Sequence, residues 1–507
     1  MLDHPRAGVP RPGGLAPVRL SALGVGVPSG PDVEVTGITA GSAMVRPGDL
    51  FAGVPGRSGP GARFVPDALA AGAVAVLTDA AGRSFVPDGV PVLVVPDVRA
   101  ALGEISSIVY GRPSEAMNVL GVTGTSGKTT TTFLMQAGLL AADRVPGLIG
   151  TVATLVGADE IKTGFTTPEA PEVQALLAVM RERGVTDVVM EVSSHALALG
   201  RAGGIEFAVG AFTNLSEDHL DFHADMEDYF AAKARLFGAH TRRSVVVVDD
   251  EWGRRMADGV PADVTVATTS AAATWTVRNV EERPGGSSRF DIAGPGVDVA
   301  GGCAVPGRYN VANALLAVAM LHEAGVAAEV SAPAVAAASV PGRMERVDAG
   351  QPFLAIVDYS HKPAAVAGAL RALRPLTGNK LIVVLGCGGD RDRGKRPHMG
   401  EIAARGAQLL IVTDDNPRSE DPAEIRQAML AGALAVPPAE RGEVIEIGDR
   451  RAAITAAVAA AGPGDAVLVA GKGHETGQEI AGVVHPFDDR EVLREALTAQ
   501  GAQGAQP

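Results

Sequence analysis

The chain has 507 residues, 46% of them hydrophobic, and a formal net charge of −14 at pH 7. This length favours about three domains over a single core, and the negative charge argues against nucleic acid as the main partner. No apolar stretch reaches the ~18 residues of a membrane span, and the two cysteines, Cys303 and Cys387, lie far apart without metal-site spacing. We expect a soluble protein of a reducing compartment, the cytoplasm.

Residues 1–112 predict a small α/β domain. Residues 1–30 are rich in Pro and Gly and lack the apolar core of a signal peptide, so we expect them to be frayed. Polar loops contain Ser42 and the run Arg57-Ser58-Gly59, which on local signals alone serve only to turn the chain. Strands are predicted at 33–38, 72–77 and 92–95, and helices at 65–71 and 99–110.

A glycine-rich turn at residues 121–132, GVTGTSGKTTTT, joins a short β-branched run to an apolar run with helical spacing. Glycines let backbone N–H groups and a helix N-terminus converge on an anion, Lys128 adds a positive charge, and the Thr129 hydroxyl can ligate Mg²⁺. The usual P-loop has a glycine where this chain has Val122, so the motif is a variant. We predict a phosphate-binding loop.

The region 113–342 alternates strands with helices, which is typical of a parallel sheet covered on both faces. In such sheets ligands bind beyond the carboxyl ends of the strands. Because Glu191 lies near the carboxyl end of one predicted strand and His219 follows another, we expect them to face the phosphates held by Lys128. Strands are predicted at 119–123, 187–192, 209–214 and 244–248.

Lys233 breaks the amphipathic pattern of the predicted helix 226–237. It lies three or four residues from Tyr229, Phe230, Leu236 and Phe237, and therefore on the apolar face. Such a lysine normally extends its amine to the edge of the core. Near a cation site, a buried lysine can instead react with CO₂ to give a carbamate, an anionic oxygen ligand.

Further along, Asn310 and Asn313 begin another helix, where they either cap it or read a nucleotide base. From Arg343 onward a third region again alternates predicted strands with helices, which is typical of a Rossmann-like parallel sheet. Its strands are predicted at 354–357, 381–385, 409–412 and 466–469, and each is followed by polar residues.

These polar residues would meet at one edge of a parallel sheet. Arg391 and Arg418 can grip a carboxylate, and Glu475 can accept from an amine, so the set suits a ligand that carries both groups. Solvated loop charges are the alternative. The residues that follow the strands are Asp358, Arg391, Asp415, Asn416, Pro417, Arg418, Gly471 and Glu475.

Ten motifs in this order resemble those of the Mur ligases, and most of all the diaminopimelate-adding members. The resemblance covers nearly everything from Ser42 onward. It implies an ADP-forming, ATP-dependent amide ligase that adds meso-diaminopimelate to UDP-N-acetylmuramoyl-L-alanyl-D-glutamate in cytoplasmic peptidoglycan synthesis, with a monomeric chain. The motifs are GTSGKTT, EVSSH, SEDHLDFH, the Lys233 helix, GRYNVANALLA, VPGRMERV, DYSHKP, GCGGDRDRGKRP, DNPR and AGKGHE.

The resemblance also implies roles for individual residues, with Lys128, Glu191, His219 and Lys233 as the catalytic set. ATP would contact Gly124, Thr125, Ser126, Gly127, Lys128, Thr129, Thr130, Asn310, Arg343 and Asp358. Two Mg²⁺ ions would be held by Thr129, Glu191, His219 and Lys233 as N6-carboxylysine. The UDP-dipeptide would contact Ser42, Arg57, Ser58, Gly59, Thr166, Thr167, Ser193 and Arg201. Diaminopimelate would contact Arg391, Asp415, Asn416, Pro417, Arg418, Gly471 and Glu475.

Three departures from the family pattern are Ala43, Leu199 and Lys362, where arginine, glutamine and threonine are common. Two other ligases remain open: a lysine-adding homologue, which would make poor use of two arginines, and a folylpolyglutamate synthetase, in which DNPR is not expected. A catalytically inactive ATP-binding scaffold is a further alternative, and the joint presence of the four catalytic candidates argues against it. The implied domains are 1–112, which binds the UDP-substrate, 113–342, which binds ATP, and 343–507, which binds the amino acid.

Overall fold

The computed structural model describes residues 9–56, 59–157, 159–161, 163–283 and 285–504. The chain divides into two compact units. The predicted α/β class, with three parts each built on a sheet, is confirmed. The first unit comprises Met1–Val277, Ile292–Val299 and Leu315–Val335, and the second comprises Arg278–Asp291, Ala300–Ala314 and Ala336–Pro507.

The N-terminal sheet has five strands, all parallel except for the edge strand β2 (Val27–Ser29), which is antiparallel to β7 (Val92–Val94). Its main helix, α2 (Val98–Val109), begins at Asp97, whose side chain accepts hydrogen bonds from two backbone N–H groups. Such an N-cap satisfies donors that the helix leaves open. The sheet order is β2 (Val27–Ser29), β7 (Val92–Val94), β6 (Ala75–Thr78), β5 (Asp49–Ala52) and β4 (Gly37–Thr39), with α1 (Val65–Ala70) as its other α-helix.

The expected fraying of the N-terminus is wrong for residues 9–30, while residues 1–8 lie outside the described part of the chain. Strand β1 (Val18–Arg19) pairs with β3 (Glu34–Val35), and Leu20 and Leu23 are buried just after it. The Arg11 guanidinium also pairs with the buried Asp49 carboxylate, 2.8 Å away at Nη2–Oδ2. The expectation of fraying rested on Pro and Gly content, which carries no information about such long-range contacts. The strand predicted at 33–38 is correspondingly split into β3 and β4.

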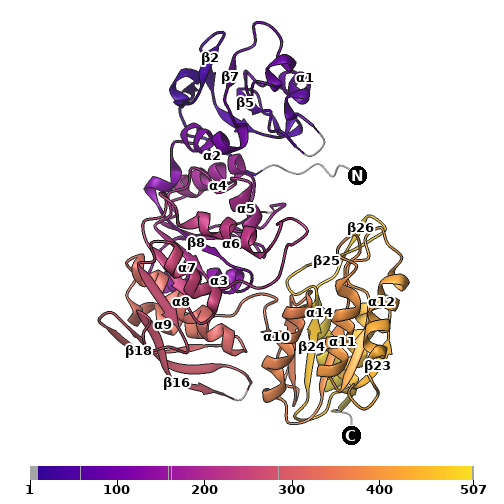
Figure 1. Ribbon diagram of the computed structural model, residues 1–507. Helices are drawn as coiled ribbons and strands as arrows, with labels where there is room; N and C mark the ends of the chain where they lie inside the picture. The colour runs from indigo at the N-terminus through magenta and orange to yellow at the C-terminus, as the bar shows by residue number, and fades with distance from the viewer. Residues whose placement is uncertain (1–8, 57–58, 158, 162, 284, 505–507) are drawn as a thin grey trace. The chain divides into compact units, whose positions relative to one another are not determined.

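Helix α4 (Ala170–Glu182) is buried on two sides, which is typical of a helix that is hydrophobic all round. Its small residues Ala170, Ala175 and Ala178 pack into the core that contains Leu102 and Ile105 of α2. Its larger side chains belong to the core of the central sheet. Figure 1 shows α2 and α4 side by side. The central residues that α4 contributes are Val173, Leu176, Leu177, Val179 and Met180.

The central sheet has eleven strands, and all four predicted strands are among them. From β9 to β16 neighbouring strands are parallel. The order is β11 (Asp159–Ile161), β10 (Thr154–Val156), β9 (Pro146–Ile149), β12 (Asp187–Glu191), β8 (Asn118–Thr123), β13 (Val209–Phe212), β14 (Ser244–Val247), β15 (Val264–Ala267), β16 (Trp275–Glu282), β17 (Ser288–Gly294) and β18 (Val297–Cys303). Its α-helices also include α3 (Lys128–Ala141), α5 (Ser194–Ala198), α6 (Met226–Ala234), α7 (Glu251–Gly259), α8 (Arg308–Glu323) and α9 (Ala328–Ala337).

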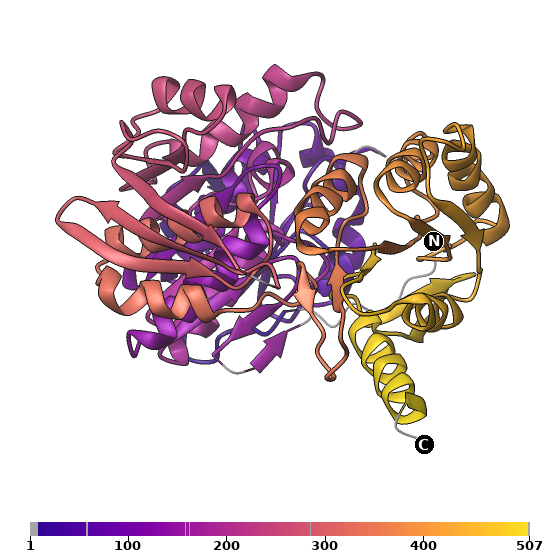
Figure 2. The ribbon, with the colours of Figure 1, turned by 90° about the horizontal axis from the view of Figure 1, so that it is seen from below.

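The second unit is built on a six-stranded sheet, with helices on both of its faces (Figure 2). The strands from β20 to β23 are parallel, so their carboxyl ends meet at one edge, as predicted. The order is β19 (Glu345–Arg346), β20 (Leu354–Asp358), β24 (Ala466–Ala470), β21 (Leu381–Leu385), β22 (Leu409–Val412) and β23 (Glu443–Glu446). The helices are α10 (Pro363–Leu373), α11 (Lys395–Gly406), α12 (Pro422–Ala435), α13 (Arg450–Ala460) and α14 (Asp489–Gly504), and β25 (Gly477–Ile480) pairs with β26 (Val483–Pro486).

Within the described residues, every helix is too short or too polar to cross a lipid bilayer.

Candidate functional site

The predicted phosphate loop lies between β8 and α3, and its glycines are required by its geometry. Gly127 precedes α3 with φ of +90°, in the left-handed region that favours glycine. A Cβ atom on Gly124 would lie 1.8 Å from the Thr213 hydroxyl oxygen. The Lys128 ammonium donates to the carbonyls of Gly124, at 2.8 Å, and Thr125, at 2.9 Å. The loop thus brings a cation and a helix N-terminus together, as an anion site requires.

The end of strand β13 holds this loop in place. The Thr213 hydroxyl donates to the Ser126 carbonyl at 2.6 Å, and the Ser126 N–H donates to the Asn214 side chain at 3.0 Å. The Thr125 N–H donates to the Asn214 carbonyl at 2.9 Å. The end of β13 therefore fixes the loop that follows its parallel neighbour, β8.

Glu191 ends strand β12 and places a buried carboxylate beside the loop. It is 1% exposed and accepts from the Thr129 hydroxyl at 3.0 Å. It also accepts from the N–H and hydroxyl of Thr151, at 2.8 and 3.1 Å. A carboxylate and a hydroxyl at this separation are the hard oxygen ligands that Mg²⁺ prefers. Sequence reasoning missed Thr151, which carries no motif of its own.

His219 follows β13 in a left-handed backbone conformation, with φ of +55°. Its Nε2 lies 3.3 Å from an Asp218 carboxylate oxygen. Its ring contacts His195 edge-on at 4.8 Å between centroids and lies 6.1 Å from the Tyr229 ring. Burial lowers the pKa of His195. Because the Tyr229 hydroxyl lies 3.1 Å from the Thr125 hydroxyl, His219 is joined to the loop through this tyrosine.

Lys233 on α6 reaches the same loop from the other direction. Its side chain is buried, 1% exposed, and its ammonium donates to the Gly124 carbonyl at 2.9 Å. It also lies 4.4 Å from the centroid of the Tyr229 ring. The normal expectation, an amine extended to solvent, is therefore wrong. Among the described residues, no three His, Cys, Asp or Glu side chains form a metal-binding group. The Thr129 hydroxyl and the Lys233 side chain are candidate ligands of other chemical types.

Four residues predicted to contact the UDP-dipeptide gather around Glu191. The Thr167 hydroxyl donates to the Glu191 carbonyl at 2.8 Å and accepts from the Ser193 N–H at 3.2 Å. Arg201 donates to the Thr167 carbonyl at 3.2 Å. The Thr166 hydroxyl lies 2.9 Å from that of Thr151, the residue bonded to Glu191. The structure therefore places these candidates around the end of β12, where the Glu191 carboxylate lies beside the phosphate loop.

The N-terminal candidates are less closely connected. Ser42 begins a short 3₁₀ helix, Ser42–Met44, and is half-buried. Gly59 exchanges backbone hydrogen bonds with Gly56. Arg57 and Ser58 lie outside the described residues.

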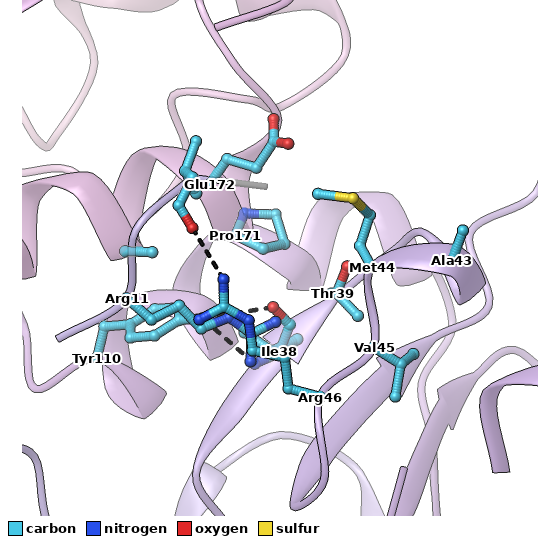
Figure 3. Close-up of a pocket in the computed structure, with 12 residues that line it drawn as sticks. Arg11, Ile38, Thr39, Ala43, Met44, Val45, Arg46, Tyr110, Pro171 and Glu172 are labelled. Carbon is cyan, nitrogen blue, oxygen red and sulfur yellow. Dashed lines mark hydrogen bonds between the residues drawn. The ribbon is translucent and has the colours of Figure 1, made fainter. Parts of the chain in front are cut away.

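A pocket of about 200 Å³ opens between the N-terminal sheet and α4, and its lining includes Pro171 and Glu172 of α4 together with Arg11 and Arg46 (Figure 3). None of the predicted site residues within the described chain lines it. Arg11 is held by Asp49, and Arg46 donates to the Val9 carbonyl at 3.3 Å. Because these arginines serve the fold, we assign the pocket to the joint between sheet and helix.

In the second unit, Asp358 ends β20 and organises its surroundings. Its carboxylate accepts from the backbone N–H groups of Met344, at 2.8 Å, and Ser360, at 3.1 Å. The neighbouring Arg343 guanidinium lies 4.5 Å from the centroid of the Tyr359 ring.

Asn310 lies in the first turn of α8, and its side chain is buried. Its amide nitrogen donates to the Pro306 carbonyl at 2.7 Å, so this side chain stabilises the start of the helix as a donor, whereas an N-cap side chain accepts from the backbone.

The predicted amino-acid residues meet at the carboxyl edge of the second unit's sheet. Asn416 donates to the Glu475 carboxylate at 2.7 Å. Arg418, with φ of +54°, donates to the Gly389 carbonyl at 2.7 Å, which joins the DNPR loop to the loop that carries the exposed Arg391. The predicted meeting of these loops is confirmed.

Sequence reasoning missed Lys472, which is fully buried in the loop after β24. Its ammonium contacts both Asn416 and Glu475. A lysine between two glycines directly after a buried strand was the available signal.

Three family models match the chain: the Mur ligase family catalytic domain over residues 34–110, the Mur ligase middle domain over 122–321, and the Mur ligase glutamate ligase domain over 342–473.

Two curated relatives, both UDP-N-acetylmuramoyl-L-alanyl-D-glutamate–2,6-diaminopimelate ligases, match nearly the whole chain. That of Streptomyces coelicolor is 54% identical over 96% of this chain and 98% of the relative. That of Corynebacterium glutamicum is 51% identical over 94% of this chain and 95% of the relative. A solved structure of a ligase of the same name is 31% identical, with a TM-score of 0.71, over 96% of this chain and 100% of its own. This chain therefore belongs to the Mur ligase family of ATP-dependent ligases.

Proposed function

We propose that the protein adds meso-diaminopimelate to the side-chain carboxylate of D-glutamate in UDP-N-acetylmuramoyl-L-alanyl-D-glutamate, with ATP converted to ADP and phosphate. The observation that carries this proposal is the amino-acid site, where Arg418, Asn416 and Glu475 share one sheet edge. The similarity to the Streptomyces coelicolor ligase over nearly the full chain supports the same substrates.

The first step activates a poor electrophile. A glutamate carboxylate oxygen attacks the γ-phosphorus of ATP, the bond to the ADP oxygen breaks, and an acyl phosphate and ADP result. Lys128 and the N–H groups at the start of α3 bind the phosphate oxygens in this step. Mg²⁺, when bound by Thr129, Glu191, His219 and carboxylated Lys233, would supply further positive charge to these oxygens.

The second step forms the amide. The amine nitrogen of diaminopimelate attacks the acyl carbonyl carbon, loses a proton, and expels inorganic phosphate. Arg418 and Arg391 would hold the distal carboxylate and Glu475 the distal ammonium, so that the other amine reaches the carbonyl. Orientation of this kind converts an encounter between two ligands into a reaction within one complex.

The other two substrates are assigned to the residues that the family resemblance implies. ATP would contact residues 124–130 together with Asn310, Arg343 and Asp358. The UDP-dipeptide would contact Thr166, Thr167, Ser193 and Arg201, with Ser42 and residues 57–59 on the N-terminal part. The corresponding boundaries are 1–112, 113–342 and 343–507, and the working form is a monomer.

A phosphate-release assay with the purified chain, ATP, Mg²⁺ and the UDP-dipeptide tests the proposal. Release should require meso-diaminopimelate, and mass spectrometry should find the UDP-tripeptide. Release that prefers lysine or D-Ala-D-Ala would contradict the proposed substrate, and release without any amide product would contradict the proposed reaction.

A further inference from the structure

Lys472 is a fully buried cation at the amino-acid site. Its ammonium donates to Asn416 Oδ1 at 3.0 Å and to Glu475 Oε2 at 3.1 Å, and it lies 3.8 Å from Asp415 Oδ1. The flanking Gly471 and Gly473 have φ of +118° and +54°, and a Cβ on Gly471 would lie 2.7 Å from Asp415 Oδ2. The backbone therefore turns sharply to direct this one side chain inward.

The exposure of the three charged groups shows which of them can meet a ligand. The Lys472 side chain is 0% exposed, that of Asp415 is 8% exposed, and that of Glu475 is 30% exposed. Burying an ammonium is costly unless it is paired and hydrogen-bonded. Lys472 thus lies behind the two carboxylates, and Glu475 presents its carboxylate to solvent in front of it.

The hydrogen bonds also fix the orientation of Asn416. An ammonium only donates, so Lys472 selects the amide oxygen of Asn416, which accepts from the Glu479 N–H as well, at 2.9 Å. The amide nitrogen is then directed at Glu475 Oε2, 2.7 Å away. Both bonds that Glu475 accepts from Lys472 and Asn416 end on Oε2, which leaves Oε1 for a ligand.

We propose that Lys472 is a positioning residue of the amino-acid site, one that fixes Asn416 and the Glu475 carboxylate so that Glu475 accepts from the distal ammonium of the added amino acid. This inference rests on the proposed function, because it assigns that ammonium to Glu475. Lys472 itself does not touch the substrate. Its removal therefore acts on amino-acid binding through Glu475.

The test replaces Lys472 by Met, which keeps the length of the side chain and removes the charge. The KM for meso-diaminopimelate should rise by about 30-fold or more, as when one partner of a buried charge pair is removed. The KM values for ATP and the UDP-dipeptide should stay within about threefold of the parental values. Val467→Ala, a truncation in the buried strand that leads into this loop, is the matched control for lost stability and should leave the diaminopimelate KM unchanged.

A double-mutant cycle separates positioning from general support of the fold. In a Glu475→Gln background, which already lacks the carboxylate, Lys472→Met should add little to the diaminopimelate KM. Additive losses, or equal rises in the KM values of all three substrates, would overturn the proposal. Circular dichroism and thermal melting verify folding, and Lys472→Gln, which retains a hydrogen-bond donor, replaces Lys472→Met if the latter does not fold.

Failure of the proposed function is a separate result. If the parent chain uses another amino acid, the diaminopimelate assignment is wrong, and Lys472 is tested on the KM for the amino acid that is used. An unchanged KM for that amino acid in Lys472→Met would overturn the positioning role in either case.

Discussion

Lys128 and Lys233 meet on one oxygen atom, because the carbonyl of Gly124 accepts from both ammonium groups, at 2.8 and 2.9 Å. A carbonyl has two lone pairs and can accept both bonds. One lysine begins α3, directly after the loop, and the other arrives from α6, more than a hundred residues later in the chain. Both lysine side chains therefore hold the loop, and each has a separate, testable part in the chemistry.

Lys128→Ala should lower ATP turnover by on the order of 100-fold or more, because the loop loses its charge for the phosphates. The chain should still fold, since this lysine lies in the loop at the start of α3 and donates to the carbonyls of Gly124 and Thr125. Phosphate release, circular dichroism and melting temperature check this. Arg183→Ala, which removes an exposed ion pair, is the control. Parental ATP hydrolysis in Lys128→Ala would show that the loop does not bind phosphate as proposed.

Lys233 should carry a carboxyl group on Nζ, formed when the amine attacks CO₂ and loses a proton. Lys233→Ala should lose most turnover, and short carboxylates should restore part of it by supplying the missing oxygen ligand. Lys233→Arg is the sharper variant, because it keeps a cation but cannot form the carbamate. Carbon-13 NMR with labelled bicarbonate should show one carbamate signal in the parent. Full activity of Lys233→Arg would exclude a carbamate role.

Arg418→Ala should weaken use of meso-diaminopimelate by about 30-fold or more, the lower end of the ~2–5 kcal/mol cost of removing one partner from a buried charge pair. Trace activity with lysine, which lacks the distal carboxylate, should change little. Steady-state kinetics with both amino acids measure this, with Arg405→Ala, an exposed ion-pair residue, as the control. Equal losses for both amino acids would place Arg418 outside carboxylate recognition.

Asp49→Ala should destabilise the first unit by about 3–5 kcal/mol, because Arg11 would be left as an unpaired, largely buried charge. Asp32→Ala, which removes an exposed carboxylate that lies 3.7 Å from Arg19 and accepts hydrogen bonds from Ser21, should cost much less. Urea unfolding of both variants gives the comparison. Similar midpoints for the two variants would mean that Arg11 does not anchor the N-terminal residues.

Burial lowers the pKa of His361 to about 4, and the nearby cations Lys362, Lys395 and Arg343 act in the same direction. The unfolded chain, with an ordinary histidine pKa near 6.5, binds this proton more readily, so this contribution to stability falls as pH drops from about 6.5 to 4. The loss should be on the order of 1–2 kcal/mol, because His361 is only half-buried.

His361→Gln should therefore flatten the dependence of melting temperature on pH in this window. The exposed His485→Gln is the control and should keep the parental slope. An unchanged slope in His361→Gln would show that this imidazole does not control the acid response.

Much of the parallel sheet in the second unit could be predicted from the sequence. The strands at 381–385 and 409–412 agree with prediction to the residue, because strands buried on both faces appear as unbroken apolar runs. The residues after such strands could then be assigned to one edge of the sheet, which located Arg418 and Glu475 correctly.

Other features depend on contacts that no local pattern encodes. Strand β23, with the sequence EVIE, is exposed at both ends and has no apolar run to mark it. The order of residues 9–30 depends on Arg11 reaching Asp49, 38 positions away. Lys472 resembled an ordinary loop charge, because the carboxylates that surround it come from other parts of the fold as well as from its own loop.

Helix α4 contributes side chains to both the N-terminal core and the central core, and this affects folding during synthesis. Its alanines complete the core that contains Leu102 and Ile105, yet its sequence begins about sixty residues after α2 ends. During synthesis, which proceeds from the N-terminus, the first sheet therefore emerges with an open apolar face. It can close that face only after residue 182 has left the ribosome. A truncated chain that ends at residue 112 would keep this surface exposed and would aggregate.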